Sequence, residues 1–170
     1  MSRLFGAYRQ NGYVVEDLDS AIKYWTEKMG LKLLHFSYLE SQAHPPLNVA
    51  LANFGDVQIE LIQPKDNTPS PYRDFLDKKG SGLHHVCVWS DNYDADLARL
   101  AALDIRPDCT GEVHGGGRFC YFDSAKQEGT SIEVGDTGTS PAFKELSAKI
   151  HKASINWDGN DPIRDMSTLL

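Results

Sequence analysis

Two acidic residues stand inside apolar stretches of this 170-residue chain. Glu60 lies between an isoleucine and a leucine, and Glu133 lies between an isoleucine and a valine. Both stretches are predicted to be β-strands, in which alternate side chains share a face, so each carboxylate faces away from its apolar neighbours. If these faces line the inside of a curved sheet, the two carboxylates need a positively charged partner. A divalent cation would balance both charges.

Two further polar residues stand where the first strand of each half of the chain begins. The residue numbers of Gln10 and His85 differ by 75, and those of Glu60 and Glu133 differ by 73, so the two pairs keep nearly the same register. The amide oxygen of Gln10 and an imidazole nitrogen of His85 would complete four protein ligands and leave one or two positions for water or substrate. This ligand set suits zinc, nickel, cobalt, manganese or ferrous iron and does not decide among them.

The elements that must position these residues occur twice along the chain. A strand that begins at Gln10 and another that begins at His85 both run into acidic turns. Apolar residues three or four positions apart then predict a helix, and three strand-like stretches follow in each half. We therefore predict an α+β fold in which two tandem βαβββ modules form a curved, mostly antiparallel sheet around a central cavity. The predicted inward helical positions are Leu18, Ile22, Trp25 and Met29, then Tyr93, Leu97, Leu100 and Leu103.

The predicted boundaries follow the changes in pattern along the chain. Prolines and glycines between the halves indicate a linker around a short helix from Tyr72 to Lys78. Ser140 followed by Pro141 predicts the start of a later helix, because proline is favoured in the first helical turn. The last residues, 155–170, have no clear periodicity and are predicted to pack on the domain or on a partner subunit. The units are residues 1–136 for the paired modules (8–64, a linker at 65–82, and 83–136) and 137–170 for a C-terminal helix and tail.

Composition excludes several classes of function. The chain has 17 Lys and Arg against 24 Asp and Glu, a formal net charge of −7, so nucleic acid and anionic membrane are unfavourable partners. No apolar run is long enough to span a membrane, and the N-terminal residues lack a signal-peptide core, so we expect a cytoplasmic protein. The three cysteines are an odd number without a CxxC pair, which disfavours a disulfide framework and a zinc ribbon.

The paired modules with these ligand positions resemble the vicinal oxygen chelate superfamily, which includes glyoxalase I, methylmalonyl-CoA epimerase, extradiol dioxygenases, and bleomycin and fosfomycin resistance proteins. The resemblance covers roughly residues 8–136 and is greatest to the epimerase and glyoxalase branch. Three segments carry it: Gly12-Tyr13-Val14-Val15-Glu16-Asp17-Leu18-Asp19-Ser20-Ala21, Ile59-Glu60-Leu61-Ile62-Gln63-Pro64 and Gly82-Leu83-His84-His85-Val86-Cys87-Val88.

The resemblance implies four metal ligands: Gln10 first, Glu60 second, His85 third and Glu133 fourth. This combination is similar to that of eukaryotic glyoxalase I, whereas the epimerases usually have histidine at the first position. The resemblance further implies a metal-dependent lyase or isomerase that moves a proton next to a carbonyl through a metal-stabilised enolate. Glu133 is the expected catalytic base, and Glu40 is the second catalytic candidate. A small-molecule substrate and a homodimer are the expected partners.

Other interpretations remain open at this point. The chain could be a resistance-type protein that binds a small molecule without chemistry, or an extradiol dioxygenase, which in this superfamily uses two histidines and one glutamate around ferrous iron. His84 is predicted to point to the opposite face of the strand from His85, as a structural residue or a support for a ligand. Cys87 is predicted to be a core residue. Fold alone does not choose among these chemistries.

Overall fold

The computed structural model describes residues 7–28, 36–41, 45–113, 117–122, 130–137, 140–155 and 157–168. The elements in chain order are β1 (Ala7–Val14), α1 (Leu18–Lys23) with a π-helical turn (Tyr24–Lys28), β2 (Phe36–Ser41), β3 (Leu47–Phe54), β4 (Val57–Pro64), α2 (Pro71–Lys79), β5 (Gly82–Ser90), α3 (Tyr93–Ala102), β6 (Cys109–Val113), β7 (Gly117–Phe122), β8 (Ser131–Asp136), α4 (Pro141–Ser154), β9 (Ile163–Asp165) and a 3-10 turn (Met166–Thr168). The predicted helical position Met29 lies outside the described residues.

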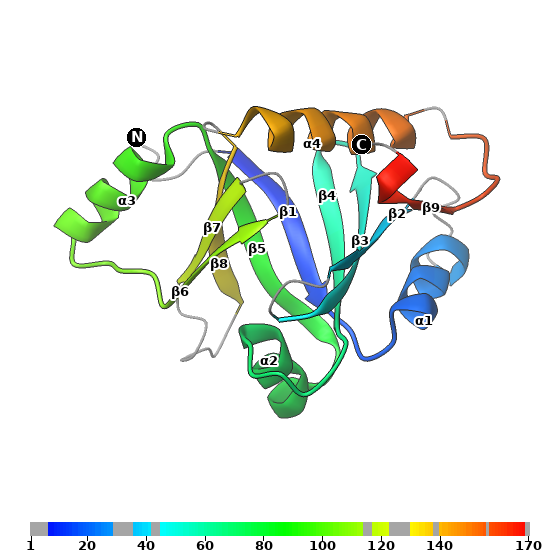
Figure 1. The fold of residues 1–170 in the computed structure, drawn as a ribbon, viewed down its shortest axis with the longest axis horizontal. Coiled ribbons are helices and arrows are strands. Elements are labelled where there is room, and N and C mark those ends of the chain that lie inside the picture. The colour runs from blue at the N-terminus through cyan, green and yellow to red at the C-terminus, as the bar shows by residue number, and fades with distance from the viewer. Residues whose placement is uncertain are drawn as a thin grey trace.

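Within these ranges, nine strands form one sheet in the order β6-β7-β8-β5-β1-β4-β3-β2-β9 (Figure 1). The strands β1 and β5 lie antiparallel at its centre. On one side of this pair come β4, β3 and β2, and on the other side come β8, β7 and β6 in the corresponding order. The junctions β1–β4, β5–β8 and β2–β9 are parallel. The predicted α+β class is therefore confirmed. The sheet is mixed, because it contains both parallel and antiparallel strand pairs.

The two faces of the sheet have different hydrophobic clusters. Leu18 and Ile22 of α1 pack with Ile59 and Leu61 of β4 on one face. On the opposite face, Tyr72 of α2 packs with residues of β1, β4 and β7. Since Glu60 alternates with Ile59 and Leu61, its side chain lies on the α2 face.

Helices α2 and α4 lie at opposite ends of the central strands (Figure 1). Both begin with a serine cap followed by proline in the first turn, which the sequence predicted for α4. The hydroxyl oxygen of Ser70 accepts from the Arg73 backbone N–H at 3.1 Å, and that of Ser140 accepts from the Phe143 N–H at 3.2 Å. Such caps satisfy backbone donors that the first helical turn leaves free.

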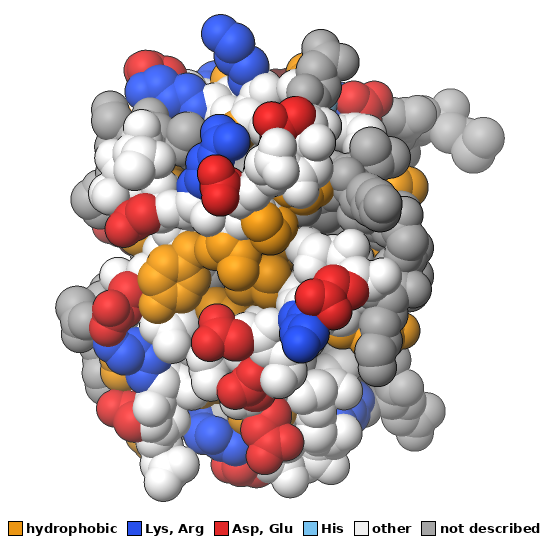
Figure 2. Space-filling view, turned by 90° about the vertical axis from the view of Figure 1, so that its right-hand side faces the viewer, with side chains coloured by type: hydrophobic (Ala, Val, Ile, Leu, Met, Phe, Trp, Pro, Cys, Tyr) orange, Lys and Arg blue, Asp and Glu red, His pale blue; other side chains and the backbone are white. Residues whose placement is uncertain are grey.

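The C-terminal residues add an element that the sequence pattern did not predict. Residues Ile163–Asp165 form β9, which pairs in parallel with β2 at the edge of the sheet. Figure 2 shows that hydrophobic side chains gather at the centre of the face on this side of the molecule, surrounded by charged ones. Among the described helices, none is both long and apolar enough to cross a membrane.

Candidate metal and acid-base site

Three of the four predicted ligands meet on the α2 face of the sheet. The Nε2 atom of His85 lies 3.3 Å from Oε2 of Glu60 and 3.0 Å from Oε2 of Glu133. Strand register explains this meeting, because Gly12 of β1 pairs with both Glu60 and His85. On the other side of β5, Glu133 pairs with Cys87, two residues beyond His85.

The His85 ring occupies the space that a side chain at position 12 would fill. A Cβ atom added to Gly12 would lie 1.9 Å from Cε1, 2.2 Å from Nε2 and 2.5 Å from Nδ1 of His85. These separations are far below van der Waals contact. Glycine at position 12 is therefore required for His85 to lie flat across β1 between the two carboxylates.

Burial and charge oppose each other in this cluster. The side chain of His85 is fully buried, while those of Glu60 and Glu133 are 19% and 11% exposed. Burial lowers the pKa of His85, but the neighbouring carboxylates of Glu133 and Glu60 outweigh it and leave the pKa above its usual value. Burial raises the pKa of Glu133, partly offset by the charge of His85. The site therefore favours positive charge between the two acids.

The donor set fits a divalent cation. The buried Nε2 atom of His85 has no properly oriented hydrogen-bond partner in the described residues, although two carboxylate oxygens lie close to it. Nitrogen and oxygen donors at about 2.1 Å from a metal are themselves roughly 3 Å apart, which is the spacing found here. Within the described ranges no group of three His, Cys, Asp or Glu side chains has the complete geometry of a metal site.

A second layer of buried groups holds the Glu133 carboxylate. Interactions with the hydroxyl of Tyr121 and the thiol of Cys87 lower the pKa of Glu133. Tyr121 in turn exchanges a hydrogen bond with Tyr72 of α2, with 3.1 Å between the two hydroxyl oxygens. This chain of contacts connects α2 to the acid and fixes the carboxylate orientation.

His84 lies beside His85, which corrects the prediction that the two side chains point to opposite faces. The Nδ1 atoms of the two rings are 2.9 Å apart, and both rings pack against Tyr121. The cause is an irregularity in the β1–β5 pairing, where Gly12 pairs with His85 but Tyr13 pairs with Leu83, so the register skips His84. An extra residue of this kind breaks the strict alternation of side chains. Burial lowers the pKa of His84 to about 3, with His85 and Lys79 contributing.

Comparison with known families identifies this arrangement. The family model described as glyoxalase/bleomycin resistance protein/dioxygenase superfamily matches residues 9–122. The chain belongs to this superfamily. The resemblance inferred from the sequence segments is thereby confirmed.

Individual relatives within the superfamily are distant. The uncharacterized protein YqjC of Bacillus subtilis is 39% identical over 95 residues, which are 56% of this chain and 65% of that protein. The mitochondrial methylmalonyl-CoA epimerase of Mus musculus is 31% identical over 93 residues, which are 54% of this chain and 50% of the epimerase. The alignments thus span about half to two thirds of these curated relatives.

Solved structures in the superfamily share the fold. The methylmalonyl-CoA epimerase of Mycobacterium tuberculosis has a TM-score of 0.67 at 24% identity, and the match covers 80% of this chain and 91% of the epimerase. A variant of the Streptomyces coelicolor epimerase, solved with 2-nitronate-propionyl-CoA, has a TM-score of 0.66 at 19% identity, and the match covers 80% of this chain and 97% of the epimerase. At such identities the likeness concerns the fold.

The remaining predicted ligand, Gln10, lies beside the cluster on β1. Gln10 pairs with Gln58 on β4, and its amide Nε2 donates to Oε1 of Gln58 at 2.8 Å. Both glutamines are buried on the same face as Glu60, and Gln58 comes two residues before Glu60 on β4. A role for the Gln10 amide oxygen as a ligand remains a prediction, and the bond to Gln58 is made by the amide nitrogen.

The structure does not bring Glu40 to this site. Glu40 lies on β2 in an ion pair with Lys65, and its side chain is 48% exposed. It alternates in phase with Phe36 and Tyr38, which pack in the α1 cluster on the opposite face of the sheet from Glu60.

Tyr72 was not singled out from the sequence as a neighbour of the site, and Tyr121 was not predicted to lie beside Glu133. His84 was predicted as a structural residue or a support for a ligand, but on the opposite face of the strand. Tyr121 could have been found from the register, because it pairs directly with Glu133 across β7 and β8. Tyr72 lies in the linker helix, whose docking position depends on tertiary packing and leaves no mark in local sequence.

Proposed function

We propose that this chain is a metal-dependent lyase or isomerase that moves a proton next to a carbonyl group. The observation that supports it best is the meeting of Glu60, His85 and Glu133 around one buried Nε2 atom. These three residues would hold a divalent cation, with Gln10 as the predicted fourth ligand. When bound, such a cation supplies positive charge that stabilises an oxyanion on the substrate.

Glu133 is the proposed base. Its carboxylate would accept the proton from the carbon next to the carbonyl, and the electron pair of the broken C–H bond would pass to the carbonyl oxygen as an enolate. Return of the proton to the other face, or to the neighbouring carbon, gives the isomeric product. In the metal-free protein, burial raises the pKa of Glu133. Tyr121 and Cys87 would keep the carboxylate oriented during both transfers.

The superfamily relatives suggest the first compound to test. Since curated and solved relatives include methylmalonyl-CoA epimerases, methylmalonyl-CoA is a reasonable first substrate, and small α-oxygenated carbonyl compounds form the second group. The experiment is NMR detection of solvent deuterium entering the substrate with metal-loaded protein. We expect exchange that falls by about 10²-fold or more in Glu133→Gln. Exchange that persists unchanged in this variant would contradict the role of Glu133.

A non-catalytic binding protein of the resistance type is the second candidate, because a cavity of ≈ 330 Å³ lies on the same face of the sheet. This alternative predicts that ligand binding tolerates Glu60→Gln and Glu133→Gln. An extradiol dioxygenase ranks lower, because the cluster has one histidine and two glutamates, and His84 contacts His85 through Nδ1. The homodimer is retained as a proposal, with the hydrophobic area of Figure 2 as a candidate surface.

A further inference from the structure

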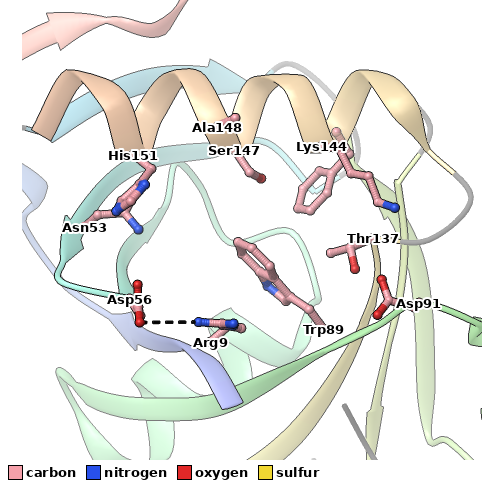
Figure 3. Close-up of a pocket in the computed structure, with 11 residues that line it drawn as sticks. Arg9, Asn53, Asp56, Trp89, Asp91, Thr137, Lys144, Ser147, Ala148 and His151 are labelled. Atoms are coloured by element: carbon pink, nitrogen blue, oxygen red, sulfur yellow. Dashed lines mark ion pairs between the residues drawn. The ribbon is translucent and has the colours of Figure 1, made fainter. Parts of the chain in front are cut away.

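A cavity of ≈ 330 Å³ lies between α4 and the sheet (Figure 3). Its floor includes Asn53 of β3 and Trp89 of β5. By strand alternation these side chains share the face that carries Glu60 and His85. The cavity therefore opens on the same side of the sheet as the proposed site, and its volume is at the small end of the range for ligand pockets.

Gly135 connects the cavity with the acid cluster. A Cβ atom added at this position would lie 3.6 Å from Cδ1 of Trp89 and 3.8 Å from Oε1 of Glu133. The indole of Trp89 and the carboxylate of Glu133 thus both lie within contact distance of the position that a Cβ atom of residue 135 would occupy. Gly135 therefore lies between the indole edge in the cavity and the carboxylate of the proposed base.

Helix α4 presents cationic and neutral side chains to the cavity. Five of its side chains line the cavity, at positions that repeat at helical spacing: Phe143, Lys144, Ser147, Ala148 and His151. The nearby acid of the helix, Glu145, forms an ion pair with Lys149 at 3.1 Å. Among the described residues, neither Lys144 nor His151 has an ion-pair partner, and both reach toward the cavity in Figure 3.

Apart from α4, the charged residues that line the cavity are Arg9 and two acids, Asp56 and Asp91. Arg9 and Asp56 face each other with 3.9 Å between the guanidinium and the carboxylate. Asp91 also lines the cavity, on the side where Lys144 lies, and no ion pair joins these two described residues. The ring of Phe143 stands edge-on to Trp89 at 6.1 Å between centroids, which gives the cavity an apolar wall. Among the described residues that line the cavity, Lys144 on α4 is therefore a cation without an ion-pair partner.

We propose that this cavity binds a distal anionic group, a carboxylate or a phosphate, of the compound that reacts at Glu133, through Lys144 and His151 of α4. The inference rests on the proposed function and adds the substrate class: a compact carbonyl compound with a second, anionic end. A lysine ammonium and an imidazole N–H are suitable donors to such a group. The C-terminal helix thereby becomes part of the substrate site.

Hydroxamates that chelate a divalent metal provide the test. Co²⁺-loaded protein is titrated with succinohydroxamate, glutarohydroxamate and adipohydroxamate, and with the methyl-ended hexanohydroxamate, and binding is followed by calorimetry and by the visible spectrum of Co²⁺. We expect the best carboxylate-ended probe to bind about tenfold more tightly than the methyl-ended one. A phosphonate-ended hydroxamate distinguishes the two anions, and tighter binding of either supports the proposal.

Variants assign the effect to α4. Lys144→Gln and His151→Gln should remove the preference for the anionic probe and leave the affinity for Co²⁺ alone unchanged. Lys149→Gln is the matched control on the same helix and should keep the preference, and Asp91→Asn should strengthen it. Equal binding of the carboxylate-ended and methyl-ended probes overturns this inference and leaves the metal site standing. A preference for the anionic probe that persists in the double variant Lys144→Gln, His151→Gln does the same. Failure of every hydroxamate to bind overturns the proposed function and this inference with it.

Discussion

The Nδ1 atom of His84 lies 2.9 Å from the Nδ1 atom of His85, with both rings buried. One of these nitrogens must donate and the other must accept. If His85 donates, its Nε2 atom carries a lone pair toward the space between the two carboxylates, as a metal ligand requires. His84 would then fix the orientation of the ligand.

Replacing His84 tests this positioning role. His84→Phe keeps an aromatic ring against Tyr72 and Phe75 but removes the acceptor. We expect the affinity for Co²⁺ or Zn²⁺, measured by calorimetry, to fall about tenfold. His151→Phe, a histidine on α4, is the control and should bind metal like the wild type. Equal metal affinity in the two variants would show that His84 only fills space.

The close approach of His85 to β1 makes a second prediction. Gly12→Ala places a methyl group where the imidazole lies, so it should destabilise the fold by about 1–3 kcal/mol in chemical denaturation and also weaken metal binding. Gly82→Ala is the matched control, because its nearest neighbour would be Cζ of Phe75 at 3.9 Å. Comparable losses in both variants would mean that strand flexibility, rather than the His85 ring, is responsible.

Stability of the metal-free protein should depend on pH with a defined sign. The pKa of His85 is raised in the folded state, so its stabilising effect is complete below about 6.5, the ordinary value, and is lost as pH rises through the folded value. The pKa of His84 is lowered to about 3, so its contribution is present above about 6.5 and is lost as pH falls. In the presence of a chelator, denaturation experiments should therefore give maximal stability near pH 6.5.

A bound divalent cation should change how the stability of the protein depends on pH above neutrality. Protons and metal compete for the same three side chains, so added Zn²⁺ should stabilise the protein more at about pH 8 than at pH 6. His85→Gln should remove the loss of stability above neutral pH in chelator. A chelated wild type that becomes steadily more stable up to pH 8 would contradict the arrangement of charges described here.

Comparing variants of Gln10 and of its hydrogen-bond partner Gln58 tests whether Gln10 is a metal ligand. If Gln10 is a ligand, Gln10→Ala should weaken metal binding by about tenfold or more, while Gln58→Ala should leave it nearly unchanged. If both variants bind metal equally well, the pair acts only as a buried hydrogen bond. Calorimetry on the two variants gives the answer directly.

The sequence predicted those features that repeat along the chain. The duplicated strand and helix patterns gave the α+β class, and matched positions in the two halves selected Glu60, His85 and Glu133. Side-chain alternation gave the correct face for the acids because their strands are regular.

The features that the sequence did not predict depend on irregular strand pairing and on tertiary packing. His84 was assigned to the wrong face because the pairing of β1 with β5 is irregular at this point, which breaks the strict alternation of side chains. Glu40 was chosen through a loosely aligned stretch and lies on the α1 face with Lys65. The edge strand β9 has no periodicity, since its position depends on pairing with β2.

Metal analysis tests most directly whether Glu60, His85 and Glu133 form one cation site. Protein purified without chelator, then loaded with Co²⁺ or Zn²⁺ and desalted, should retain about one equivalent per chain, and His85→Ala and Glu133→Gln should retain almost none. Wild-type protein that retains no metal above background, or variants that retain as much as the wild type, would contradict the account.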